Sequence, residues 1–280
     1  MREIDLHTHT DISDGSESPE NTIRHAKELG LRAIAVTDHD SVNGVKAAQE
    51  AGEKYGVEVV PGMELSCGWY NKEVHILAYD LDPDSDKLPP VLSWVVEDRN
   101  ERNRKMIDLL AKDGIMVDID ELQAKHPGST IGRPHFALCL MEAGIADSVT
   151  DAFKRFLDPG RKYYVRRHFL SLEDAVGLII SAGGKAVIAH PRQYKISEES
   201  LTELLERGAA AGVSGLECFY SGYGPEDIAK YLAMAERYGF CPTAGSDWHG
   251  SHKPHIQMGS GIDGELCAPY EILSNLRAHK

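Results

Sequence analysis

The stretch SPENTIRHAKELGLRAIAVTDH, residues 18–39, contains the unit that decides the fold. Ser18 and Pro19 are a typical cap and first residue of a helix, and apolar residues at helical spacing follow as far as a glycine. A short strand-like run at residues 33–36 comes next and ends in polar residues at His39. The stretch therefore reads as one helix followed by one strand whose end carries a candidate ligand.

The same unit recurs along the chain. Helical patterns at residues 47–56 and 171–182 lead into strand-like runs at 57–60 and 186–189. Two more copies of the unit have their strand-like runs after Gly212 and after Gly239. The polar residues that end these four copies of the unit are Glu64, His190, Glu217 and Asp247. With strands at 4–6 and 74–79, the count is seven, which predicts an α/β fold with a parallel sheet closed, or nearly closed, into a barrel. Chemistry in such barrels lies at the carboxyl ends of the strands.

One segment breaks this rhythm. Residues 91–164 contain no strand-like run, and helical patterns occupy 91–112, 120–124, 134–143 and 148–157. We predict a barrel from residues 1–90 and 165–280, with 91–164 as a small helical insert that caps the active face. Within the insert, the charged run at 97–105 is expected to be a solvated helix face.

Composition restricts the function classes. Lys and Arg number 30 against 44 Asp and Glu, a net charge of −14, which disfavours binding to long nucleic acid or to anionic membranes. The longest apolar stretch, residues 175–189, is too short and too interrupted to span a bilayer. Five scattered cysteines without a CxxC pair, and a polar N-terminus without a signal peptide, lead us to expect a cytoplasmic protein with reduced thiols.

Histidines and carboxylates gather at the predicted strand ends. His7 and His9 are two residues apart on the first strand, so their side chains point to the same side. The full candidate set is His7, His9, Asp14, His39, Glu64, His75, His190, Asp247 and His249. Imidazole and carboxylate donors without thiolates suit divalent Zn, Mn or Fe. Nine donors exceed the needs of one ion and predict a cluster in which a carboxylate bridges.

These residues lie in motifs that resemble a known family. Their order is similar to that of the PHP (polymerase and histidinol phosphatase) domain, over residues 1 to about 90 and about 165 to 250. The motifs that carry the resemblance are, in chain order, HTHTDISDG, TDHD, PGMELS, VH at 74–75, AHP and GSDWH. The resemblance implies a distorted seven-stranded, TIM-like β/α barrel with a trinuclear metal centre. It also implies phosphoesterase activity.

The resemblance distributes the ligands among three ions. His7, His9, Glu64 and Asp247 would hold the first. Glu64 would bridge to a second, which His75 and His190 complete. Asp14, His39 and His249 would hold the third.

Other residues are candidates for substrate contact. Arg133 and His135 stand at a predicted helix start in the insert, where we expect a phosphate clamp and assign them catalytic and substrate-binding roles. Arg192 follows the ligand turn at His190 and is a further substrate-binding candidate, with an exposed loop position as the alternative. The basic and aromatic run at 161–168 could stack a base or form a half-buried strand. Asp5 and Asp38 flank ligands and are candidates for orienting them.

The function expected from these residues is hydrolysis of phosphate monoesters by a hydroxide that bridges the metals. Within the family, the insert resembles that of small phosphoesterases that act on nucleoside 3′,5′-bisphosphates or on 5′ ends of short oligonucleotides. Alternatives are a histidinol-phosphate or sugar-phosphate phosphatase, an amidohydrolase-type C–N hydrolase, and a structural module of a DNA polymerase. The sequence leaves the oligomeric state open.

Overall fold

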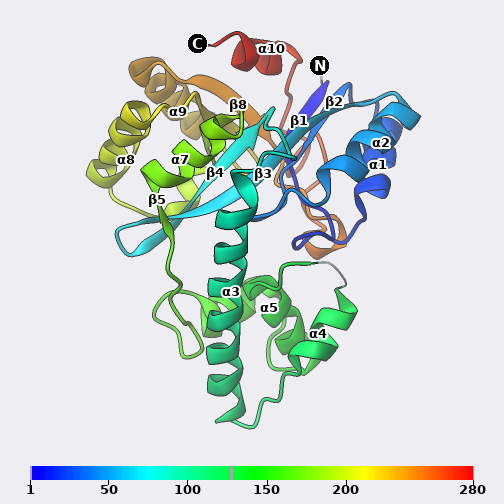
Figure 1. Ribbon diagram of the computed structural model, residues 1–280, viewed down its shortest axis with the longest axis vertical. Coiled ribbons are helices and arrows are strands. Elements are labelled where there is room, and N and C mark those ends of the chain that lie inside the picture. The colour runs from blue at the N-terminus through cyan, green and yellow to red at the C-terminus, as the bar shows by residue number, and fades with distance from the viewer. Residues whose placement is uncertain (1, 127–128, 280) are drawn as a thin grey trace.

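The computed structural model describes residues 2–126 and 129–279 and has two parts (Figure 1). The upper part is a strand-rich barrel with both chain ends at its top, and the lower part is a helical lobe that extends from it along α3. The strands are β1 Ile4–Thr8, β2 Ala33–Val36, β3 Glu58–Trp69, β4 Lys72–Tyr79, β5 Leu170–Ser171, β6 Lys185–Ile188, β7 Gly215–Tyr220 and β8 Cys241–Gly245.

The sheet is a nearly closed barrel, as predicted. Its strand order is β1-β2-β3-β4-β6-β7-β8, and the short β5 pairs with β3 off this path. Backbone bonds from Asp247 N to His7 O (2.8 Å) and from His9 N to Trp248 O (2.9 Å) join the first strand to the segment after the last. The seam therefore runs directly through candidate ligands.

One strand departs from the predicted parallel arrangement. β4 runs antiparallel to both of its neighbours, β3 and β6. Only Tyr70 and Asn71 separate Trp69 from its partner Lys72, so β3 and β4 form a hairpin, and Tyr70 adopts the positive φ (52°) that two-residue hairpin loops favour. A connection this short cannot carry the crossover that parallel strands need. β3 also extends through Glu64, which the sequence placed after the strand.

Helices cover the outside of the barrel. They are α1 Pro19–Glu28, α2 Val45–Tyr55, α7 Leu172–Ser181, α8 Glu198–Ala211, α9 Pro225–Tyr238 and α10 Glu271–Ala278. The predicted cap at Ser18 is confirmed, because its Oγ accepts from Asn21 N (3.3 Å). Ser171 caps α7 in the same way, with its Oγ accepting from Asp174 N (3.1 Å). Small and branched residues such as Leu6, Ala35 and Val187 form an apolar core against Tyr79.

The lobe has an apolar core of its own. It consists of α3 Leu88–Ala111, α4 Ile119–Lys125, α5 Arg133–Glu142, α6 Val149–Ala152 and a π-helical turn, η1, at Phe153–Leu157. Met106, Leu110, Phe136 and Leu140 are fully buried in one cluster, whose buried members in the described part of the chain all lie within residues 106–163. No helix in the described ranges has both the length and the apolar composition needed to cross a membrane.

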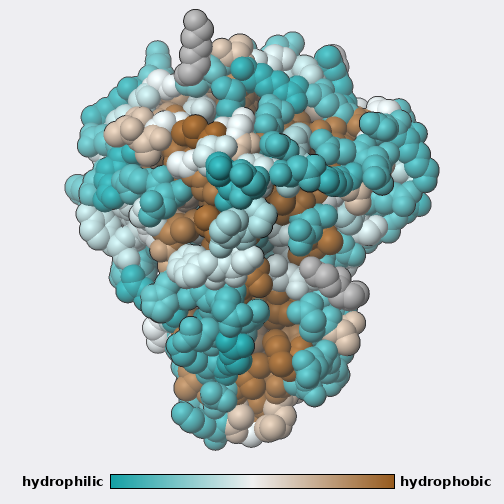
Figure 2. Space-filling view, viewed as in Figure 1, coloured by the Kyte–Doolittle hydropathy of each residue, from teal (hydrophilic) through white to brown (hydrophobic). Residues whose placement is uncertain are grey.

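The prediction of a solvated face at residues 97–105 is wrong in part. Lys105 does pair with Glu101 (2.6 Å), and Figure 2 shows hydrophilic colouring along this length of α3. Arg99 and Arg102, however, are buried. They continue the buried row of Val95 and Met106 at spacings of three and four residues, so they lie on the inner face of the helix.

The chain returns to the barrel without the half-buried strand that was one interpretation of residues 161–168. Regular strand structure begins only with β5 at Leu170. Arg167 in this segment is buried, and its guanidinium contacts Asp40 and Glu73 at 3.5 Å each. The segment thus contributes a cation to the boundary between lobe and barrel.

Candidate metal centre and cavity

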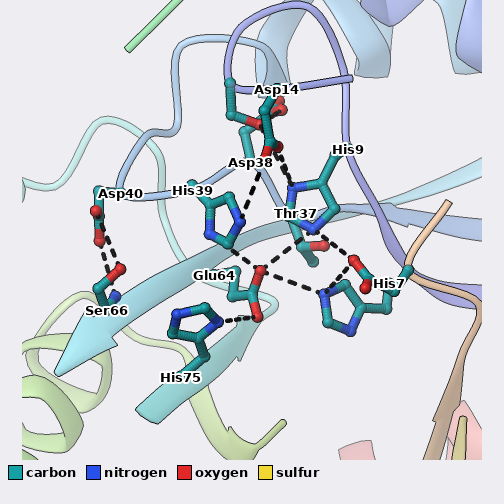
Figure 3. A network of polar contacts seen from close by, with 12 residues as sticks. His7, His9, Asp14, Thr37, Asp38, His39, Asp40, Glu64, Ser66 and His75 are labelled. Carbon is teal, nitrogen blue, oxygen red and sulfur yellow. Dashed lines mark hydrogen bonds and ion pairs between the residues drawn. The ribbon is translucent and has the colours of Figure 1, made fainter. Parts of the chain in front are cut away.

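One carboxylate stands at the centre of the candidate site. Glu64, buried in the middle of β3, is surrounded by imidazoles that approach from different strands (Figure 3). Its Oε1 lies 2.8 Å from both His75 Nδ1 and His190 Nε2. Its Oε2 lies 3.1 Å from His39 Nδ1, 3.2 Å from His9 Nε2 and 3.4 Å from His7 Nε2. Five imidazoles from four segments of the chain therefore converge on a single side chain.

Two further carboxylates flank this centre. Asp247 Oδ1 lies 3.3 Å from His9 Nε2 and 3.7 Å from His7 Nε2. Asp14 Oδ1 lies 3.2 Å from His249 Nε2, and Asp14 Oδ2 lies 3.8 Å from His39 Nε2. All nine residues of the candidate set are thus brought to one place at the mouth of the barrel.

The nine residues form four overlapping groups. Within each group, the ligand atoms all lie within 4.8 Å of one another. The groups are His9, Asp14, His39 and His249; His7, Glu64 and His190; His7, His9 and Asp247; and His39, Glu64 and His75. Buried nitrogens His7 Nε2, His9 Nε2 and His39 Nδ1 face these carboxylates yet make no hydrogen bond of ordinary geometry with the described chain. Unsatisfied buried donors that converge in this way fit a divalent cation.

The electrostatics of the site favour cations. Burial works to lower the pKa of His9, but the nearby carboxylates of Asp247 and Glu64 raise it to about 9. For His75, burial is likewise outweighed, chiefly by Glu64, and the pKa rises to about 10. Burial dominates at His39 and lowers its pKa to about 3. Three buried carboxylates thus create a negative potential in which a metal ion can replace protons on the surrounding imidazoles.

Glu217 orients His7, a role that the sequence did not assign to it. Its Oε1 lies 3.0 Å from His7 Nδ1, and its Oε2 accepts from His190 N at 2.7 Å. A carboxylate at Nδ1 fixes the ring and directs Nε2 toward Glu64. The signal was present in the sequence, because Glu217 is the charged residue inside the otherwise uncharged strand β7.

Asp38 and Asp5, the two carboxylates that flank ligands in the sequence, bind neighbouring backbone segments. Asp38 accepts from Thr10 N (2.8 Å), from Thr10 Oγ1 (2.7 Å) and from Ser13 Oγ (2.6 Å), so it shapes the loop that carries Asp14. Asp5 accepts from the backbone of Ser246 (2.9 Å) and of His7 (3.2 Å). Asp5 therefore links the first strand to the segment before Asp247.

Backbone conformation at the site is unusual. His190 (φ 22°), Asp247 (φ 59°) and Asp40 (φ 53°) lie in the left-handed region, which non-glycine residues rarely adopt. A Cβ on Gly245 would lie 2.2 Å from the Cβ of His7. The sheet thus leaves room for only a hydrogen at position 245, and the strained positions indicate that packing imposes the ligand geometry.

A cavity of about 420 Å³ opens beside the carboxylates. Barrel residues such as Asp14, Glu64 and His190 line one side, and Arg133 and His135 from the start of α5 line another. Arg133 pairs with Glu73 at 2.6 Å, and burial lowers the pKa of His135 to about 4. The lobe therefore brings Arg133 and His135 to the same cavity as the candidate ligands.

Arg192 takes a different position. Its Nη1 lies 2.8 Å from Asp227 Oδ2 and 3.0 Å from the carbonyl oxygen of Gly222. Its side chain is more than half exposed, and it is not among the residues that line the cavity. The geometry fits the alternative interpretation of an exposed loop position.

Several cavity residues were not singled out from the sequence. Lys253 Nζ lies 3.0 Å from Asp247 Oδ2, and Tyr220 donates to the same oxygen at 2.7 Å. Arg99 and Arg102 reach the cavity from α3. Their helical register with Val95 and Met106 was the available signal for the two arginines, whereas nothing local distinguished Lys253.

Comparison with known proteins agrees with this geometry. The family described as the PHP domain matches residues 5–207. The 3′,5′-nucleoside bisphosphate phosphatase of Chromobacterium violaceum is 36% identical over 272 residues, 96% of this chain and 95% of that protein. The 5′-3′ exoribonuclease Rnm of Escherichia coli is 32% identical over 268 residues, 93% of this chain and 91% of that protein. A crystal structure from Bifidobacterium adolescentis, provisionally described as a metal-dependent phosphoesterase, aligns with a TM-score of 0.86 and 31% identity over 98% of this chain and 95% of that one.

Proposed function

We propose that this chain, which belongs to the PHP domain family and is a metal-dependent phosphoesterase, hydrolyses phosphate monoesters on nucleoside 3′,5′-bisphosphates. The observation that carries the proposal is the convergence of five imidazoles on Glu64 beside a cavity whose other side is lined by arginines. The names of two relatives that align over nearly the whole chain supply the nucleotide part.

The nine residues of the candidate set would hold three divalent ions of Mn, Fe or Zn. His7, His9, Glu64 and Asp247 would hold one; Glu64, His75 and His190 a second; Asp14, His39 and His249 a third. Ions in such a site lower the pKa of bound water and offset the charge of a phosphoryl group. The overlap of the four ligand groups supports the sharing of Glu64.

His135 would serve as a neutral hydrogen-bond donor. Gly132 N donates to its Nδ1 at 3.0 Å, so the ring proton lies on Nε2. That Nε2 is buried and has no partner among the described residues, and the low pKa keeps the ring neutral at physiological pH. His135 can therefore donate to a phosphoryl oxygen and is a poor source of a proton for the leaving group.

Arg133 would act as a movable clamp. Its side chain is partly exposed, lines the cavity and is held by Glu73 in this structure. A guanidinium group makes strong, charge-assisted bonds to phosphate oxygens. We propose that the lobe, residues 91–164, presents Arg133 and His135 to substrate bound at the barrel, residues 1–90 and 165–280.

Hydrolysis at the 5′ ends of short oligonucleotides is a second candidate, favoured by the likeness to the E. coli exoribonuclease. It uses the same ligands and the same cavity. The two candidates differ in the bond that is broken: a bisphosphate would lose a terminal phosphate monoester, whereas an exoribonuclease would break the phosphodiester that joins the first nucleotide to the rest of the strand.

A substrate panel on metal-analysed protein tests the proposal. Elemental analysis should find divalent ions, and phosphate release should be faster from nucleoside bisphosphates than from histidinol phosphate, sugar phosphates or mononucleotides. Amides and lactams should not react. Chelation should abolish phosphate release, and added Mn²⁺ or Zn²⁺ should restore it. Faster turnover of sugar phosphates, or any hydrolysis of amides at comparable rates, would overturn the assignment.

A further inference from the structure

Two of the candidate ligands, His75 and His190, come from neighbouring strands of the barrel. His75 lies on β4 and His190 follows β6, and each ring has a nitrogen 2.8 Å from Glu64 Oε1. The two rings meet edge to face, with centroids 5.3 Å apart. The antiparallel register of β4 and β6 ends at Ile76 and Ile188, so it stops short of both ligands. The separation of the two histidines therefore depends on contacts beyond the regular ladder.

A phenol takes part in the next rung of this ladder. One half of the rung is ordinary, because Ala189 N donates to His75 O at 3.1 Å. In the other half, His75 N donates to the hydroxyl of Tyr194 at 3.3 Å. That hydroxyl has one proton to give and lies 2.5 Å from Ala189 O and 3.0 Å from His75 O. The direct bond from His75 N to Ala189 O that a regular antiparallel pair makes is thus replaced by a bridge through one oxygen atom.

The turn after β6 returns this phenol to the sheet. The turn is a short 3₁₀ helix, η2 Pro191–Tyr194, and the residues on either side of it, His190 (φ 22°) and Lys195 (φ 50°), both have positive φ angles. Tyr194 is only 5% exposed, and its ring meets that of His190 edge to face at 5.8 Å. The backbone therefore folds back on itself within four residues and places the hydroxyl beside the strand ends.

Loss of the hydroxyl would alter the spacing of both ligand-bearing segments. The oxygen contacts the backbone of His75 and that of Ala189, the residue directly before His190. Without it, His75 N and Ala189 O would either lose a partner or close into a direct bond that draws the strand ends together. Metal sites tolerate deviations of only about 0.2 Å in their ligand distances. Either change would therefore weaken a site that needs both rings.

We infer that Tyr194 is a positioning residue for the second ion, because its hydroxyl fixes the separation of His75 and His190. This inference rests on the proposed function, in which these histidines complete the second site beside Glu64. In the described part of the chain, Gln193 and Lys195 line the cavity but Tyr194 does not. Its effect on the reaction therefore passes through the two ligands and not through contact with substrate.

Tyr194→Phe tests this role, because it removes the hydroxyl and keeps the ring. After loading with Zn²⁺ or Mn²⁺ and desalting, elemental analysis should find one ion fewer per chain than in wild type. Titration against a chelator should show about 10- to 100-fold weaker binding of that ion. Excess metal should restore phosphate release, with KM for the substrate unchanged. A full set of ions bound with wild-type affinity would overturn the inference.

Tyr223→Phe is the matched control. Tyr223 is 3% exposed, and its hydroxyl accepts from Arg192 N, in the same turn, at 3.3 Å. This variant should lose a similar amount of thermal stability and keep every ion. Loss of metal in both variants would assign Tyr194 a packing role only and contradict the inference. In a His75→Ala background, Tyr194→Phe should remove no further ion, whereas an additional loss would show that it acts elsewhere.

Hydrogen exchange on the wild type covers the case in which Tyr194→Phe does not fold. Zn²⁺ should slow exchange of the His75 amide, which the Tyr194 hydroxyl holds, much more than that of the Arg192 amide, which the Tyr223 hydroxyl holds. Equal slowing at both amides, measured by NMR, would contradict the inference.

The inference and the proposed function fail in different ways. Loss of one ion in Tyr194→Phe, with no phosphate release from nucleoside bisphosphates by loaded wild type, would overturn only the proposed function. Release of phosphate by wild type, with the full set of ions kept in Tyr194→Phe, would overturn only the inference.

Discussion

The barrel mouth and the lobe supply opposite charges to one cavity. The mouth presents three carboxylates and six imidazoles, held by strand ends and backbone bonds across the seam. The lobe presents arginines from α3 and α5, held by side-chain contacts to Asp40 and Glu73 of the barrel. The difference teaches that the proposed cation site and the proposed anion site rest on separate apolar cores, so we expect that each can be altered with the other left in place.

The two regions are also held in place by different kinds of contact. The candidate ligands stand in or beside paired strands. Two of them, His190 and Asp247, and the nearby Asp40 keep positive φ angles that only tight packing would maintain. The lobe is joined through ionic contacts and a few loop bonds such as Thr130 N to Ile12 O at 3.2 Å. We therefore expect changes at the mouth to affect catalysis and changes in the lobe to affect substrate capture.

The largest expected effect is at the mouth. Asp14→Ala should reduce phosphate release on the order of 10³-fold, because a carboxylate shared by His249 and His39 is lost. Metal content measured by elemental analysis should fall, and the melting transition should stay cooperative. Asp11→Ala in the same loop is the control. Wild-type rates in Asp14→Ala would remove the third ion from the proposal.

An intermediate effect is expected behind the mouth. Glu217→Gln keeps the volume but weakens the bond that orients His7, so metal affinity should fall by about 10- to 100-fold. Titration with Zn²⁺ in competition with a chelator measures this. Excess metal should largely restore turnover, which an effect on substrate contact would not allow. The exposed Glu226→Gln should leave the affinity unchanged.

In the lobe, Arg133→Ala should act on substrate alone. We expect kcat/KM to fall by roughly 10- to 100-fold, mainly through KM, with metal content unchanged. Steady-state kinetics combined with elemental analysis gives both readouts, and the exposed Arg161→Ala serves as control. An unchanged kcat/KM would return Arg133 to a structural role with Glu73, and a loss of metal would contradict the separation of the two regions.

The smallest effect is expected at Arg192. Its pair with Asp227 is exposed, and such pairs contribute about 1 kcal/mol or less. Arg192→Ala should change kcat/KM by less than about twofold and leave metal content unaltered. A loss as large as that of Arg133→Ala would restore the substrate-binding role suggested by its place after His190.

Some of the site was visible in the sequence because strand ends are local features. The repeat of helix, glycine and strand placed His39, His190 and Asp247 at the carboxyl ends of strands, and parallel strands in a barrel present those ends to the same mouth. Glu64 was found as a ligand type but placed after its strand. The hairpin explains the error, because β3 continues past Glu64 to pair with β4.

The lobe contacts were harder to predict because each depends on two distant segments. Arg99 and Arg102 were interpreted as solvent-facing, since a run of alternating charges on a helix normally is. Their burial follows from the docking of α3 against a barrel that offers Asp40 and Glu73. The role of Glu217 likewise required that β7 lie near β1 in space.

The sequence alone determined the βα repeat, the helix caps and the identity of the donors, because these follow from side-chain chemistry and from spacings within about 20 residues. Only the tertiary structure decided that five imidazoles share Glu64 and that an unpaired Arg102 faces the same cavity. The pairing of His190 with Glu64 spans 126 positions, and geometry of this kind is fixed by sheet closure and helix docking.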